Sequence, residues 1–171
     1  LFGEHGAEKW NVSDGAWSKL VELLSPVVQL AKEEGIMLVV ETGNNAMITS
    51  CFLGKKLIDD LETTHLKVLW DPANALYCGE NPSKNALDSM VGGYLGHVHM
   101  KDVEVSIHQA TIKCVALGEG QMAPHLSTIA ERLNDIDYKG SMSLESVYRP
   151  SGGDFEDGFQ ASISTFKNLF S

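Results

Sequence analysis

Apolar residues recur along the chain in two alternating patterns. Over residues 14–34 they return every three or four positions, and Gly35 follows, as is usual just past the end of a helix. Residues 36–40 (IMLVV) then form a short continuous apolar block, which is typical of a strand buried on both faces. The first pattern predicts an amphipathic helix, which Pro26 should kink or restart. The second predicts a strand that ends at Glu41.

The same alternation repeats along the rest of the chain. The expected helices are residues 53–61, 83–91, 124–133 and 155–170, and the expected strands are residues 66–70, 94–99 and 141–144. Residues 103–121 show neither pattern, and we expect them to be irregular. Strands that alternate with helices indicate βαβ units, parallel strands and right-handed crossovers. The sequence therefore predicts an α/β fold of four such units, with residues 1–171 as a single domain.

Composition and charge narrow the range of partners. With 171 residues, 43% of them hydrophobic and 21% charged, the chain resembles an ordinary globular protein. A formal charge of −10 disfavours nucleic acids and anionic membranes and leaves small molecules as the expected partners. No run of 18 apolar residues and no signal peptide is recognisable. The three cysteines lack the spacing of a disulfide framework or a thiolate zinc site, so we expect a reducing, cytoplasmic location.

Each apolar strand block ends in a residue that can bind a metal or transfer a proton. These residues are Glu41, Asp71, His99 and Glu145. In parallel α/β folds the carboxyl ends of neighbouring strands open onto the same side, where the functional site is built. One polar strand end often marks only the point where the chain leaves the core, but four carboxylate or imidazole ends are harder to explain in this way. We therefore expect the four side chains to converge.

Three carboxylates and one imidazole form a mixed set of oxygen and nitrogen ligands. Such a set suits Mn²⁺ or Mg²⁺, with Co²⁺ and Zn²⁺ as alternatives. The carboxylates would also repel one another in a partly buried site, and a divalent ion removes that repulsion. The sequence thus predicts one divalent metal ion on Glu41, Asp71, His99 and Glu145.

The segment GHVHMKD (residues 96–102) holds two histidines one residue apart. In a strand they share a face, but His99 lies nearer the carboxyl end. We predict that His99 is a metal ligand and that His97, one layer deeper, is a hydrogen-bonded packing residue or supports the site. Lys101 has two readings, either contact with a substrate carboxylate, phosphate or hydroxyl, or a solvated lysine paired with Asp102.

Two other residues near the strand ends have similar alternatives. Asn44 follows Glu41 closely and is either a hydrogen-bond partner of a sugar hydroxyl or a turn former. Trp70 precedes Asp71, so strand alternation points its side chain away from the site and toward the helices. We expect Trp70 to pack in the core.

Five segments, in this order, resemble the C-terminal half of the sugar phosphate isomerase/epimerase family. They are VVETGN (39–44), LWDPANA (69–75), GHVHMKD (96–102), ALGEGQM (116–122) and SLES (143–146). That family has the xylose isomerase-like TIM barrel and includes ketose 3-epimerases, hydroxypyruvate isomerase and inosose dehydratase. The resemblance implies that the four strands are strands five to eight of a (β/α)₈ barrel. It also implies that the loop 116–122 closes over the edge of the site.

The resemblance further implies a mechanism for a sugar or sugar phosphate substrate. One divalent metal ion would be bound by Glu41, Asp71, His99 and Glu145. Glu41 and Glu145 would also form an acid/base pair on opposite faces of the sugar, with proton abstraction next to a carbonyl and an enediolate stabilised by the metal.

The chain departs from the pattern of ketohexose 3-epimerases at two places. Three residues after the metal aspartate it has Asn74 instead of histidine, and the arginine expected a few residues beyond His99 is absent. These departures argue against ketohexose 3-epimerase specificity. Asn74, Lys101 and Asn44 are the candidate substrate contacts.

The number of strands raises a separate question, because a complete (β/α)₈ barrel takes about 250 residues. The chain is expected to be a fragment of a longer protein, a half-barrel that pairs with a second copy, or an open α/β layer that folds alone. The missing initiator methionine and the strand-like opening LFGEHG favour a fragment. Because an open parallel sheet exposes two edges, we also expect a homo-oligomer.

Two other functions compete with an isomerase. Endonuclease IV, a phosphodiesterase, shares the barrel, but it needs several metals, additional histidines and a basic groove, which a charge of −10 does not suggest. The second is a non-catalytic half-barrel that binds metal or a partner.

Overall fold

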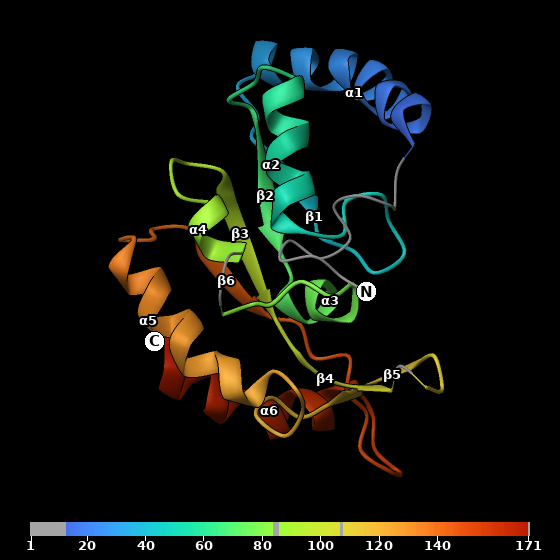
Figure 1. Ribbon diagram of the computed structural model, residues 1–171. Coiled ribbons are helices and arrows are strands. Elements are labelled where there is room, and N and C mark those ends of the chain that lie inside the picture. The colour runs from blue at the N-terminus through green and yellow to red at the C-terminus, as the bar shows by residue number, and fades with distance from the viewer. Residues whose placement is uncertain (1–12, 84–85, 107, 171) are drawn as a thin grey trace.

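The computed structural model describes residues 13–83, 86–106 and 108–170. Within these residues, four parallel strands form one sheet in the order β1-β2-β3-β6 (Figure 1). The strands are β1 (Leu38–Glu41), β2 (Leu66–Trp70), β3 (Leu95–Met100) and β6 (Ser141–Leu144). The expected α/β class with parallel strands is confirmed, and each expected strand is present.

Helices accompany the sheet on its apolar side. In the described part of the chain they are α1 (Asp14–Glu33), α2 (Cys51–Asp60), α3 (Pro72–Tyr77), α4 (Ala86–Ser89), α5 (Leu126–Asp135) and α6 (Phe155–Phe170), with a 3₁₀ turn η1 (Ala123–His125) before α5. Helices α2, α4, α5 and α6 contact one another in this order, and α2 and α6 also contact β2 and β6. They form a continuous layer beside the sheet (Figure 1).

Local sequence explains where two of the helices begin. The side-chain oxygens of Ser13 and Ser50 accept hydrogen bonds from the N–H groups of Ala16 and Leu53, at 3.3 and 3.2 Å. These caps satisfy donors that have no partner within the helix. Pro26 lies inside α1, and the helix continues through it.

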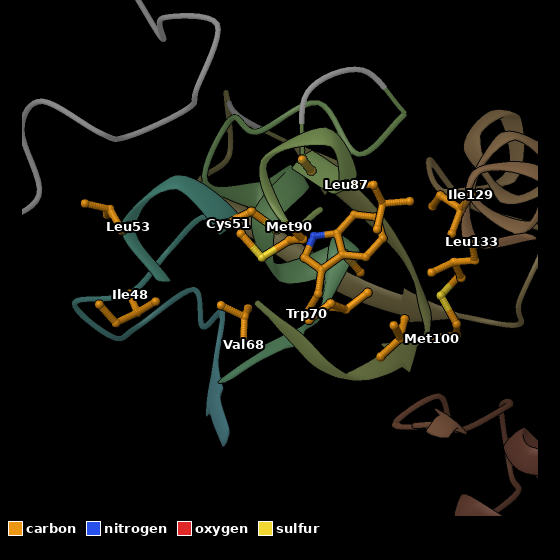
Figure 2. Close-up of a cluster of buried hydrophobic side chains, with 14 of the residues drawn as sticks. Ile48, Cys51, Leu53, Val68, Trp70, Leu87, Met90, Met100, Ile129 and Leu133 are labelled. Atoms are coloured by element: carbon orange, nitrogen blue, oxygen red, sulfur yellow. The ribbon is translucent and has the colours of Figure 1, made fainter. Parts of the chain in front are cut away.

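The core lies between the sheet and the helix layer (Figure 2). Val68 and Trp70 of β2, Met100 of β3 and Ile129 of α5 are completely buried there. Leu69 is only partly buried, because side chains alternate along a strand and it faces the other side of the sheet. The prediction that Trp70 packs toward the helices is confirmed.

The expectation that residues 103–121 are irregular is wrong. The antiparallel strands β4 (Asp102–Ser106) and β5 (Thr111–Val115) form a hairpin in this segment. Its arms alternate apolar and polar residues, but the connection between them contains no glycine, proline or asparagine that would signal a turn. Ala110 takes the left-handed conformation there, with φ of 50°.

The segment between β2 and β3 also differs from expectation. Helix α3 was not predicted, although it begins with a proline immediately after Asp71, a favourable start. The helix expected over residues 83–91 is only the short α4 within the described residues. Gly92 and Gly93 follow with φ of 98° each, a conformation that ends the helical path before β3.

The sheet is open in the described residues, since β1 and β6 each pair with one strand only. No helix in this part of the chain combines the length and the apolar character needed to cross a membrane.

Candidate metal centre

Asp71 lies at the junction between β2 and α3, where it caps the helix. Its Oδ1 atom accepts a hydrogen bond from the Asn74 N–H at 2.9 Å. Its own N–H donates to Thr42 Oγ1 at 2.9 Å, which joins the end of β2 to the end of β1. The residue is completely buried, and its second oxygen, Oδ2, faces the carboxyl ends of the strands.

Asn74 also links the junction between β2 and α3 to the end of β1. It is 8% exposed, and its side-chain amide donates to the carbonyl oxygen of Thr42 at 3.1 Å. The predicted substrate contact therefore lies beside Asp71, with its Nδ2 engaged by the backbone. Its contact with substrate stays a prediction.

His99, Glu41 and Glu145 meet across the ends of three strands. The His99 Nδ1 atom lies 3.4 Å from Glu41 Oε1 and 3.8 Å from Glu145 Oε2. The Glu145 N–H donates to the Met100 carbonyl at 3.0 Å, which continues the pairing of β6 with β3 one residue beyond the Met100–Leu144 pair.

The four strand-end residues expected to converge do so. One ligand atom from each of Glu41, Asp71, His99 and Glu145 lies within 4.8 Å of the others. Strand order sets the arrangement, because Glu41 and Glu145 come from the two outer strands and Asp71 and His99 from the two inner ones.

The buried polar atoms of this group fit a metal ion. Among the described residues, His99 Nδ1 is a buried side-chain atom without a hydrogen bond, and such an atom costs about 1–3 kcal/mol. Asp71 Oδ2 is also buried, and a cation, the Lys101 ammonium, lies beside it. Both atoms are ordinary metal ligands, and both point into the same group, so a bound divalent ion would satisfy them together.

Lys101 also reaches this group. Its Nζ donates to Glu145 Oε2 at 2.7 Å and forms an ion pair with Asp71 Oδ2 at 2.6 Å. Its side chain is 11% exposed. The reading of Lys101 as a solvated lysine paired with Asp102 is therefore wrong, because strand alternation sends the two side chains to opposite faces.

Burial and charge act in opposite directions on the Asp71–Lys101 pair. Burial raises the pKa of Asp71 above its usual value, although Lys101 beside it acts to lower that pKa. Burial by itself would lower the pKa of Lys101, but Asp71 and Glu145 together raise it. Glu145 also raises the pKa of Asp71, which reflects the crowding of carboxylates at this end of the sheet.

His97 lies one layer below His99, as expected. Its Nε2 is 2.8 Å from Ser143 Oγ of β6, and its ring meets that of His99 edge-on, with centroids 5.2 Å apart. Burial lowers the pKa of His97, with a further contribution from His99. The prediction that His97 is hydrogen-bonded is confirmed, and its support of a metal site stays a prediction.

Asp102 was not predicted as part of the site. Its carboxylate accepts hydrogen bonds, all between 2.8 and 3.0 Å, from the backbone N–H groups of Val103, Gly118, Gly120 and Met122. It thereby holds the loop 116–122 against the start of β4. A side chain at Gly120 would place its Cβ 2.4 Å from Asp102 Oδ1, so this approach requires glycine. In the sequence, Gly118 and Gly120 were the sign that the backbone of this loop approaches another part of the chain closely.

Asn44 lies apart from these contacts, on the exposed turn that follows β1. A cavity of about 590 Å³ is found at the other end of the strands, lined by Leu66, Lys67 and Tyr94 among others, and it contains none of the candidate ligands. The chemistry-bearing residues thus collect at the carboxyl ends of the strands.

Comparison with known proteins supports this picture of the fold. A family described as xylose isomerase-like TIM barrel matches residues 2–169. No curated protein gives a significant match.

Several solved structures share the fold at low identity. 3-Keto-D-glucoside 4-epimerase from E. coli has 22% identity and a TM-score of 0.71, over 91% of this chain and 54% of its own. D-Psicose 3-epimerase from Clostridium cellulolyticum H10 has 21% identity and a TM-score of 0.69, over 95% and 60%. The IOLI protein with a bound zinc atom has 17% identity and a TM-score of 0.72, over 92% and 57%. The chain therefore spans between half and two thirds of the length of these proteins.

Proposed function

The chain belongs to the xylose isomerase-like TIM barrel family, and on that basis we propose that it is the metal-binding part of a sugar or sugar phosphate isomerase or epimerase. In this proposal its parallel strands correspond to strands five to eight of the barrel. The observation that carries the proposal is the convergence of three carboxylates and one imidazole at the carboxyl ends of these strands.

The residues that would hold the ion are Glu41, Asp71, His99 and Glu145. A divalent ion bound there supplies Lewis-acid polarisation of the carbonyl and hydroxyl oxygens of a substrate. Mn²⁺, Mg²⁺, Co²⁺ and Zn²⁺ all suit such ligands, and the zinc atom in the related IOLI structure supports a divalent ion.

Proton transfer is assigned to the two glutamates. Glu41 and Glu145 come from the outer strands and flank Asp71 and His99. A sugar bound over the inner pair would have one glutamate on each face. One would take the proton from the carbon next to the carbonyl, and the other would return a proton to the opposite face.

Three further residues are proposed to contact the substrate. Lys101 reaches the group directly, Asn74 lies beside Asp71, and Asn44 is on the exposed turn after β1. The activities of the related epimerases, on D-psicose and on a 3-keto-D-glucoside, support a sugar as the substrate class.

A combined metal and exchange assay tests the proposal. The protein would be loaded with Mn²⁺, Mg²⁺, Co²⁺ or Zn²⁺ in turn and incubated in D₂O with ketoses, ketose phosphates, hydroxypyruvate and inososes. We expect one ion per chain, together with deuterium incorporation next to the carbonyl of at least one compound.

The same assay separates the competing functions. Bound metal without exchange into any compound would favour a non-catalytic metal-binding half-barrel. Several ions per chain, with cleavage of a phosphodiester in DNA, would favour an endonuclease IV-like enzyme.

A further inference from the structure

Lys101 connects two of the candidate ligands that belong to strands which do not pair with each other. Asp71 follows β2 and Glu145 follows β6, with β3 between them. The Lys101 ammonium spans this distance, at 2.6 Å from Asp71 Oδ2 and 2.7 Å from Glu145 Oε2. Its side chain is almost fully buried, so the contact is shielded from solvent more than a surface ion pair would be.

The oxygens that Lys101 contacts are those an ion would need. Asp71 Oδ1 already accepts the hydrogen bond from the Asn74 N–H, which leaves Oδ2 as its oxygen for a cation. Glu145 Oε2 is the oxygen that faces His99 Nδ1, at 3.8 Å. A metal bound by His99 would thus use the same two oxygens that hold the lysine.

An ion and the ammonium cannot share these oxygens without repulsion. Metal–oxygen bonds are about 2 Å long, so an ion on both oxygens would lie within about 5 Å of an ammonium that contacts both. Two positive charges at that separation in a partly buried site repel strongly. Lysine has a flexible four-carbon stem, which allows its ammonium to move while the backbone stays in place.

We infer that Lys101 competes with the divalent ion for Asp71 and Glu145. Without a bound ion, the Lys101 ammonium neutralises the two carboxylates and keeps them close together. When the ion binds, the ammonium moves away from both carboxylates. Lys101 then acts as a positioning residue that sets the affinity of the site for metal. This inference rests on the metal site of the proposed function.

The substitution Lys101→Met tests the competition directly, because it removes the ammonium and keeps the apolar stem. Isothermal titration with Mn²⁺ should give a dissociation constant about tenfold lower than that of the wild type. Lys113→Met is the matched control, since it removes the same charge from a side chain of the hairpin that is 71% exposed. The control should stay within about twofold of the wild type.

The outcomes distinguish the inference from the proposed function. If Lys101→Met binds Mn²⁺ as tightly as the wild type or more weakly, the competition is refuted, whereas the proposed metal site is still supported. Absence of Mn²⁺ binding in the wild type and in both variants overturns the metal site itself, and the competition with it.

A second measurement uses only the wild-type protein and so does not depend on the folding of a variant. Lysines would be acetylated briefly with and without saturating Mn²⁺, and modification would be located by mass spectrometry. Reactivity of Lys101 relative to Lys113 should rise several-fold with Mn²⁺, because the ammonium loses its buried partners. An unchanged ratio in the presence of bound Mn²⁺ contradicts the inference.

Discussion

His99 presents its Nδ1 atom to Glu41 and Glu145, and that atom is buried without a hydrogen bond. His97, two residues earlier in the same strand, has a partner in Ser143. Among the described residues, Nδ1 of His99 thus lacks a hydrogen-bond partner, whereas Nε2 of His97 has one. The difference makes His99 a ligand candidate and His97 a supporting residue.

The first prediction compares these two histidines. His99→Ala should raise the dissociation constant for Mn²⁺ by about 100-fold or more, since loss of a ligand costs more than loss of a supporting contact. His97→Ala, which removes a supporting ring one layer deeper, should raise it less, by about tenfold. Both values come from isothermal titration, and wild-type metal content in the double variant His99→Ala, Asp71→Ala would refute the ligand assignment.

The second prediction concerns the acid/base role of Glu145. Glu145→Gln keeps the size of the side chain and one carbonyl oxygen but removes the basic carboxylate. Deuterium exchange into the best substrate should fall by about 10²–10⁴-fold, the usual range for loss of a general base, while some metal binding is retained. Exchange at the wild-type rate with metal bound would assign proton transfer elsewhere.

Where β3 passes into β4, alternation of side chains organises the site. His99 and Lys101 face the candidate ligands Glu41, Asp71 and Glu145, whereas Met100 and Asp102 are buried on the opposite side. Asp102 then binds the backbone of the loop 116–122. The hairpin and the loop are thereby tied to the strand that carries His99.

The third prediction tests this anchor. Asp102→Ala removes a buried acceptor of four backbone N–H groups and should lower the free energy of unfolding by about 3 kcal/mol. Urea denaturation gives the loss, and hydrogen exchange at the amides of Gly118, Gly120 and Met122 should accelerate. Glu104→Ala, on the exposed side of the same hairpin, should do neither, and protected loop amides in Asp102→Ala would contradict the anchoring role.

Helix α2 begins against a buried carboxylate. Glu80 is 4% exposed, and its Oε1 accepts a hydrogen bond from the Cys51 N–H at 2.9 Å. Burial raises the pKa of Glu80 to about 7, although the Cys51 N–H acts to lower it. The ionised form is therefore unfavourable in the folded protein.

The fourth prediction follows from the sign of that shift. The folded protein binds the Glu80 proton more tightly than the unfolded chain, whose ordinary value is 4.5, so stability falls as the pH rises from about 4.5 to about 7. Between pH 4 and pH 8 the wild type should lose about 3 kcal/mol relative to Glu80→Gln. Urea denaturation across this range measures the difference, Glu104→Gln is the exposed control, and parallel pH profiles of wild type and Glu80→Gln would contradict the prediction.

In the part of the chain that the structure describes, the open sheet leaves apolar surface exposed. Val39 of the edge strand β1 is 46% exposed, and Leu23, Val27 and Leu30 of α1 are also exposed. An unpaired strand edge beside apolar surface favours association. The formal charge of −10 opposes it, so association should strengthen with salt.

The fifth prediction is that the chain forms a homo-oligomer through the edge strand β1 around Val39. Analytical ultracentrifugation should show association that depends on concentration and is weakened about tenfold or more by Val39→Asp, which places a charge in the contact. Val91→Asp, at an exposed apolar residue after α4, should leave it unchanged. A monomer throughout the micromolar range, or equal effects of both variants, would contradict the prediction.

Much of the fold was predictable because its signals are local. Residues 66–70 and 141–144 are strands with those same bounds, because alternate side chains of each strand are apolar and pack in or against the core, namely Leu66, Val68 and Trp70 in β2 and Met142 and Leu144 in β6. The hairpin was missed because its turn has no characteristic residue, and α3 because six residues are too few to show a helical period.

The order of apolar and polar segments along the chain was enough to predict the α/β class, the strand ends and the four residues that meet there, because parallel strands bring their carboxyl ends together. The contacts of Lys101 with Asp71 and Glu145, and of Asp102 with a distant loop, became visible in the folded structure alone. These contacts join residues 16 to 44 positions apart, and hydrogen bonds and ion pairs at such separations depend on where the packed elements place their side chains. A local pattern of hydrophobic and polar residues does not predict that placement.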